Sequence, residues 1–245
     1  MDHDPTPPSM ITRLLEEISW EKAVNYRRGG RGMENVLTAE VLIGLDLLPR
    51  THFFAAVMRS CSGADAARSI LADQAESARM SLLPGDMSVN PAVVAQKFIV
   101  QPDALILSPE VFAFVEAKRI RTSAFQPEQL AREYLTVMNN AGDRTPLLFL
   151  LGVAPPVSVR GLGKMSPKDA VRLHLPAVLE RAGNTGPTEE ELMDRLDDVV
   201  CWISWEDLLA SVRTQLAAFS CKDTSTDAAV HRTASQVISA VSWHA

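Results

Sequence analysis

A chain of 245 residues can bury one substantial hydrophobic core, and a hydrophobic share of 47% is typical of a globular protein. The net charge of −6 differs from that of strongly basic nucleic-acid-binding domains, although local patches rather than total charge decide phosphate contact. The sequence has no apolar stretch of bilayer length, no signal-peptide pattern and no close pair among its three cysteines. We therefore expect a cytoplasmic protein with no membrane partner.

A glycine-rich basic loop, NYRRGGRG, carries Arg27, Arg28 and Arg31 near the start of the chain. Such a loop can approach a phosphate backbone closely, and its guanidinium groups can donate forked hydrogen bonds. We interpret the three arginines as candidate phosphate contacts. A solvated surface loop is the alternative for each of them.

The next segment, ENVLTAEVLIGLDLLPR, has apolar residues at helical spacing and is expected to end before Pro49. Glu40 lies within its apolar stripe, between Val36 and Ile43. A carboxylate there is costly to bury unless a metal or a metal-bound water compensates it. The alternative is a Glu40 at the edge of the stripe that reaches solvent. Residues 50–83 are expected to form one or two further helices.

Two strand-like segments follow, QPDALIL and FAFVEAK. The first places Asp103 at the head of an apolar run, and the second alternates so that Glu116 and Lys118 point to the same side. If the strands pair, these three side chains converge on one small patch. Two carboxylates at that range can hold a hard divalent cation such as Mg²⁺, and an ammonium beside them can orient a water. This combination suits metal-assisted hydrolysis of a phosphodiester.

A basic turn with Arg119 and Arg121 leads into the segment PEQLAREYLTVMNNAG, which is predicted to be a helix. Pro127 suits its first turn and Gly142 its C-terminal end. The apolar run TPLLFLLGVAPP then predicts a buried strand, parallel to its predecessor because a helix intervenes. We add Arg119 and Arg121 to the candidate phosphate contacts.

The C-terminal part predicts helices around residues 167–182 and 188–197, a strand at VVCWISW, and a helix capped by Ser204. A last helix is expected to end near Trp243. The segment RGLGKMS lacks the spacing of a phosphate-binding P-loop. We interpret it as a turn, with Lys164 and Lys168 as further candidate contacts.

The Pro-Asp and Glu-Ala-Lys motifs resemble the signature of the PD-(D/E)XK, or restriction-endonuclease-like, nuclease superfamily. The resemblance covers residues 34–153, where a carboxylate helix, a meander carrying both motifs, a crossover helix and a buried strand follow in the family's order. It implies an α/β fold with a mixed central sheet flanked by helices. It also implies that Asp103, Glu116 and the carbonyl of Ala117 ligate Mg²⁺, for which Mn²⁺ can substitute, and that Lys118 positions the attacking water.

The resemblance further implies that Glu40 is the helix carboxylate of the site, where it would bind the metal through a water or complete the metal's ligand shell. Gln129 and Tyr134 resemble a glutamine-plus-tyrosine helix found in many RecB-like members, although the spacing here is one residue longer than in the commonest form. Gln129 is carried over as a candidate catalytic residue. The alternative is a solvated Gln129 and a Tyr134 that serves only packing.

We expect one nuclease domain over residues 1–245, with a mainly helical region at 1–92, a catalytic core at 93–153 and a C-terminal strand and helices at 154–245. The expected function is Mg²⁺-dependent cleavage of DNA in restriction or anti-phage defence, carried out by a homodimer or a subunit of a larger complex. One alternative is a non-catalytic nucleic-acid- or partner-binding module on the same fold. The other is an interaction protein in which Glu116 and Lys118 form a solvated pair on an edge strand.

Overall fold

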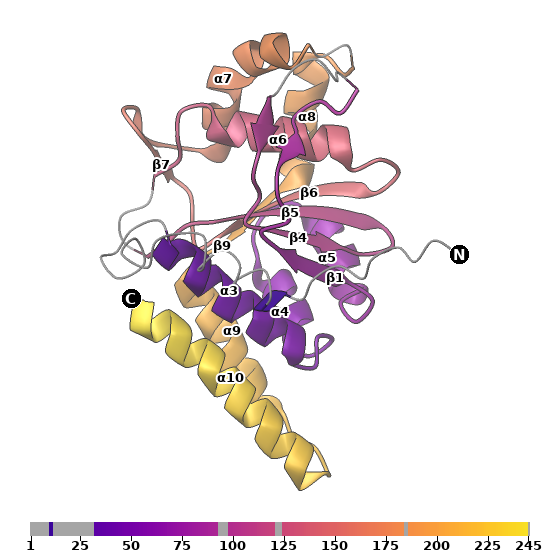
Figure 1. The fold of residues 1–245 in the computed structure, drawn as a ribbon, viewed down its shortest axis with the longest axis vertical. Coiled ribbons are helices and arrows are strands. Elements are labelled where there is room, and N and C mark those ends of the chain that lie inside the picture. Colours follow the sequence, from indigo (N-terminus) through magenta and orange to yellow (C-terminus); the bar gives the residue numbers. More distant parts are fainter. Residues whose placement is uncertain (1–9, 12–31, 93–97, 121–123, 184–185, 245) are drawn as a thin grey trace.

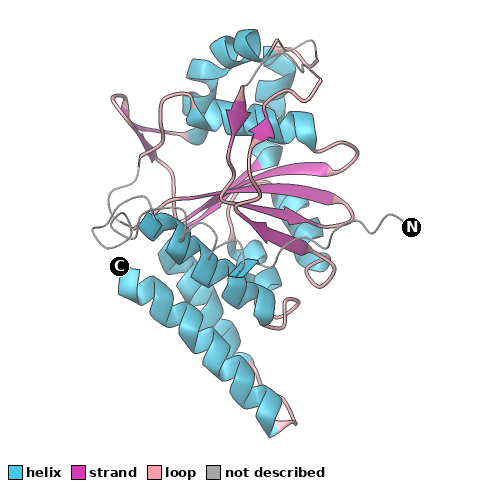
Figure 2. Ribbon diagram, in the orientation of Figure 1, coloured by secondary structure: helices cyan, strands magenta, loops and turns pink. Residues whose placement is uncertain are grey.

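The computed structural model describes residues 10–11, 32–92, 98–120, 124–183 and 186–244 (Figure 1). These form a mixed α/β fold in which a five-stranded sheet lies between two layers of helices (Figure 2). The strands follow the spatial order β1 (Arg79–Leu82), β4 (Ala104–Leu107), β5 (Val111–Ala117), β6 (Thr145–Leu151) and β9 (Val200–Ile203). β4 is antiparallel to β1 and β5, whereas β6 is parallel to β5 and β9. The predicted mixed sheet flanked by helices is thus confirmed.

The central strand β5 is buried on both faces, and its residues alternate between two hydrophobic cores. Val115 and Ala117 pack into one core, whereas Phe112 and Phe114 pack into the other. A continuous apolar run is expected for a strand that helices cover on both sides. Because β5 lies at the centre of the sheet, residues at its C-terminal end are flanked by neighbouring strands and by a core on each face.

Helices cover the two faces unequally. One face carries α3 (Gly32–Leu47), α4 (Phe54–Ser60), α5 (Asp65–Asp73), α9 (Trp205–Ala218) and α10 (Thr224–His244). The other carries α6 (Gln129–Asn140), α7 (Pro167–Ala182) and α8 (Glu189–Val199) (Figure 1). Within the described ranges, no helix has both the length and the apolar character that a membrane span requires.

Local capping explains where several of these helices begin. The Ser204 hydroxyl accepts a hydrogen bond from the Asp207 backbone N–H at 3.0 Å, so the predicted cap of α9 is confirmed. Thr188 and Glu191 form a reciprocal capping box at the start of α8. The helices predicted after residue 166 therefore begin close to where the sequence places them.

The region 50–83 differs from the prediction at its end. Helices α4 and α5 are present, but residues 79–82 form strand β1 at the edge of the sheet. This strand is too short for its alternation to be recognised, and its pairing with β4 is a contact distant in sequence. Two small two-stranded sheets complete the described structure: β2 (Met87–Ser88) with β3 (Ile99–Val100), and β7 (Val157–Val159) with β8 (Gly163–Met165).

Candidate functional site

Strand β5 ends in the motif that the sequence singles out. The side chain of Glu116 lies on the face covered by α6, because it alternates with Val115 and Ala117, which pack into the opposite core. The Lys118 backbone N–H donates to the Leu151 carbonyl at 2.8 Å, so pairing with β6 continues one residue beyond the strand. Backbone pairing thus orients both residues of the motif.

Glu116 and Lys118 form a buried ion pair. Their residues are 4% and 7% exposed, and the Lys118 ammonium donates to Glu116 Oε1. The ammonium also lies 4.9 Å from the centre of the Phe125 ring, within the range of a cation–π contact. A solvated pair on an edge strand is therefore wrong for these residues, because β5 is central and both side chains are buried.

Asp103 lies immediately before β4 and reaches across to the same motif. Its Oδ2 atom accepts a hydrogen bond from the Ala117 backbone N–H at 2.7 Å, and its own N–H donates to the Val115 carbonyl at 3.1 Å. The predicted pairing of the two strands is present, with Ala104 opposite Val115. The Asp103 carboxylate is consequently held beside the segment that carries Glu116 and Lys118.

Helix α6 contributes Gln129 to the cluster. Its side-chain amide donates to Glu116 Oε1 at 2.5 Å and to Glu133 Oε1 at 2.7 Å, and its carbonyl oxygen accepts from the Gln126 N–H at 3.2 Å. Gln129 is therefore tied to the motif rather than solvated. Tyr134 instead donates its hydroxyl to the Leu192 carbonyl of α8 and is fully buried, as expected for a packing residue.

Sequence reasoning missed Glu133, which lies one helical turn after Gln129. It is 3% exposed, and among the described residues its Oε2 atom has no hydrogen-bond partner. Burial, and then the negative charge of Glu116, hold the pKa of the Glu133 carboxyl well above its ordinary value, although Lys118 opposes this shift. A signal was present, because Glu133 falls on the apolar stripe between Leu130 and Val137.

Glu133→Gln is expected to remove a pH dependence of stability. Because the folded-state pKa is raised, the contribution of Glu133 is fully present below the unfolded-state pKa of 4.5 and is lost as pH rises toward the folded-state pKa. The variant should therefore gain stability over wild type as pH increases above that value, in urea unfolding followed at a series of pH values.

A control of opposite sign is available in Glu191, whose pKa is lowered by hydrogen bonds from Thr188. Glu191→Gln should lose stability relative to wild type at neutral pH, and the difference should vanish as pH falls through the lowered pKa. If the stabilities of wild type and Glu133→Gln change in parallel with pH, Glu133 ionises freely in the folded protein and the raised pKa is contradicted.

Two further residues that the sequence did not indicate lie against the Lys118 carbonyl. The Trp205 indole N–H donates to the Lys118 carbonyl at 2.7 Å. Gly152 packs against this contact with a φ of +81°, and a Cβ atom there would lie 2.5 Å from the Lys118 carbonyl oxygen and 2.1 Å from the indole nitrogen. Only glycine fits such a close approach in the left-handed region.

Glu40 is placed differently from the expectation. Its side chain is 48% exposed, and its Oε2 atom lies 3.5 Å from His244 Nε2 of α10. The burial that made Glu40 a candidate is absent, because the residue lies at the solvent side of its stripe. Among the described residues, its ion-pair partner is His244 rather than a residue of the Glu116–Lys118 motif.

The candidate phosphate contacts are only partly described. Arg119 is half-buried and directly follows Lys118. Arg27, Arg28, Arg31 and Arg121 lie outside the described residues. Lys168 forms an ion pair with Asp197 at 2.9 Å, whereas Lys164 lies exposed near the tip of the β7–β8 hairpin.

The oxygen atoms around the Glu-Ala-Lys motif are of the types that bind a hard cation. They are the carboxylates of Asp103 and Glu116 together with the carbonyl of Ala117, and Mg²⁺ prefers such ligands. Across the described ranges, no group of three or more His, Cys, Asp or Glu side chains is arranged to hold a metal. A cation here would therefore depend on two carboxylates and backbone oxygen.

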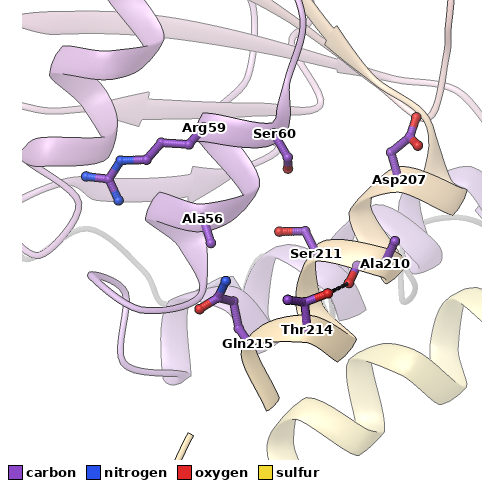
Figure 3. A pocket seen from close by; sticks show the side chains of 8 residues that line it. All are labelled: Ala56, Arg59, Ser60, Asp207, Ala210, Ser211, Thr214 and Gln215. Atoms are coloured by element: carbon purple, nitrogen blue, oxygen red, sulfur yellow. Dashed lines mark hydrogen bonds between the residues drawn. The ribbon is translucent and has the colours of Figure 1, made fainter. Parts of the chain in front are cut away.

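A broad hollow of about 640 Å³ lies elsewhere, between α4 and α9 (Figure 3). It is shallow and lined mainly by polar side chains, among them Arg59, Ser60, Asp207, Ser211 and Thr214. Both helices pack on the sheet face opposite Glu116. The hollow contains no buried ion pair and is not continuous with the cluster, so we do not assign the function to it.

Comparisons with family models, with curated proteins and with solved structures found no match to this chain.

Proposed function

We propose that this protein is a Mg²⁺-dependent deoxyribonuclease of the PD-(D/E)XK type. The observation that carries the proposal is the buried cluster at the end of β5, where Glu116, Lys118 and Gln129 are joined by hydrogen bonds and Asp103 binds the intervening backbone. A buried charged cluster is costly unless each charge is paired, and such clusters concentrate at functional sites.

The order of elements supports the same proposal. After α3 and the two short helices α4 and α5 comes β1, and after the small β2–β3 pair comes β4, which the Pro-Asp motif immediately precedes. Strand β5 with the Glu-Ala-Lys motif, the crossover helix α6 and the parallel strand β6 follow in that order. This is the order that the family resemblance implies. The antiparallel pairing of β4 with β5 supplies the convergence of motifs on which the chemistry depends.

Asp103, the Glu116–Lys118 segment and Gln129 have separate roles in the proposed mechanism. Asp103, Glu116 and the Ala117 carbonyl would hold Mg²⁺, which supplies a Lewis acid and makes an attacking water more acidic. Lys118 provides a fixed ammonium that stabilises the negative charge developing on the phosphate. Gln129 restrains the Glu116 carboxylate through its hydrogen bond at 2.5 Å.

Metal-dependent cleavage by the purified chain tests this proposal. Plasmid, linear duplex and single-stranded DNA should be incubated with Mg²⁺, with Mn²⁺ and with EDTA. We expect cutting with either metal and none in EDTA. Asp103→Asn should lose cutting, because it removes one of the two carboxylates, whereas the exposed Glu40→Gln should cut like wild type.

Persistent cutting in EDTA, or full activity of Asp103→Asn, would contradict the proposed chemistry. DNA binding without any cutting would favour a non-catalytic module on the same fold. Reduced cutting by a folded Glu40→Gln variant would return Glu40 to the site.

A further inference from the structure

The β7–β8 hairpin presents an exposed tip on a buried base. Val157 and Val159 are each 3% exposed and pack into the core beside α6. The tip, residues 160–164, is exposed throughout. In Figure 1 the hairpin stands out from the sheet and its covering helices.

Glycine determines the shape of this tip. The Leu162 N–H donates to the Val159 carbonyl at 3.1 Å, which closes a turn. Gly161 and Gly163 have φ values of +79° and +80°, and a Cβ atom at either would meet nothing within 4 Å. The glycines are therefore needed for backbone conformation, and the open space around them leaves the tip accessible to a large partner.

The charge at the tip is positive. Arg160 and Lys164 flank Leu162, which is 45% exposed, and residues 157–165 include no acidic side chain. Within the described part of the chain, neither cation has a hydrogen-bond or ion-pair partner. Lys168 and Arg181, by contrast, pair with carboxylates at 2.9 Å. Two cations that no described residue pairs with, placed around an apolar side chain, complement a polyanion with an apolar interior.

The hairpin is fastened to the residues around Lys118. Phe125 donates its backbone N–H to the Ser158 carbonyl at 2.8 Å and accepts from the Arg160 N–H at 2.9 Å. The ring of Phe125 lies 4.9 Å from the Lys118 ammonium. The position of the tip is thus coupled to the position of Lys118 through one residue.

We propose that the β7–β8 hairpin is a duplex-DNA contact, in which Arg160 and Lys164 bind phosphates and Leu162 packs into the groove between them. A two-stranded ribbon has dimensions that the major groove admits. The choice of DNA as partner rests on the proposed function and deepens it, because the hairpin would hold the duplex at a constant distance from Lys118.

Duplex binding in EDTA tests the hairpin separately from catalysis. The affinity of the full chain for a fluorescent duplex is measured by anisotropy over a range of salt concentrations. Arg160→Gln/Lys164→Gln should weaken binding about tenfold at low salt and reduce the salt slope by about 2, because each phosphate contact contributes about 0.9. Each single variant should give about half of the change in slope.

Two comparisons make the test specific. Leu162→Ser should weaken binding while leaving the salt slope unchanged, because it removes an apolar contact and no charge. Arg213→Gln/Lys222→Gln alters net charge equally but affects α9 and the loop after it, on the other side of the sheet. This control should retain both the affinity and the slope of wild type.

An unchanged slope in the hairpin variants, an equal loss in the control, or no duplex binding by wild type would overturn the inference. A loss confined to a single-stranded probe of the same sequence would overturn the assignment to duplex DNA. Wild-type binding without metal-dependent cutting would refute the proposed nuclease and leave the hairpin inference intact. Metal-dependent cutting by wild type, together with unaltered binding by the hairpin variants, would refute the hairpin inference and leave the proposed nuclease intact.

Discussion

Lys118→Met is expected to cut DNA at least about a hundredfold more slowly than wild type, with DNA affinity changed by less than about twofold. Methionine keeps an apolar stem against Phe125 but removes the ammonium that pairs with Glu116. An interaction made mainly in the transition state lowers turnover more than affinity. Single-turnover cleavage at saturating protein, with affinity measured in EDTA, separates the two effects.

Lys222→Met is the matched control for this experiment, because Lys222 is exposed in the loop after α9. It should cut at the wild-type rate. Since loss of Lys118 also affects folding, the folded fraction of each variant must be measured by circular dichroism under the assay conditions. Cleavage by folded Lys118→Met within threefold of wild type would remove the ammonium from the mechanism.

Breaking the buried ion pair should also destabilise the fold strongly. Lys118→Met leaves the Glu116 carboxylate at 4% exposure without its cation, and removal of one partner from a buried pair typically costs about 3–5 kcal/mol. Glu116→Gln/Lys118→Met should recover most of this loss, because neither charge then remains buried. Urea unfolding of the wild type, both single variants and the double variant gives the coupling free energy.

A surface ion pair provides the comparison. Arg59 and Asp73 lie 2.7 Å apart with side chains 54% and 73% exposed, so Arg59→Met should change stability little. Equal destabilisation by Arg59→Met and Lys118→Met would show that burial does not govern the Glu116–Lys118 pair. If the double variant is as unstable as Lys118→Met, the uncompensated charge is not the cause of the loss.

Part of the fold followed from local sequence pattern. The alternation in FAFVEAK placed Glu116 and Lys118 on one face, because side chains two residues apart in a strand point the same way. The helix predicted after this strand indicated that the next strand would be parallel to it, and β6 is parallel to β5. Ser204 marked the start of α9 through a contact within one helical turn. Each inference depends on residues close together in the chain.

The tertiary structure decided which other residues join the motif. Glu133 enters the cluster because α6 packs its apolar stripe on the sheet, and Trp205 reaches the Lys118 carbonyl from α9, 87 residues away. Glu40 lies beside His244 because α3 packs against α10. Strand and helix periods are set by the local backbone and can be read from sequence, whereas contacts between elements depend on how those elements pack, which no local pattern encodes.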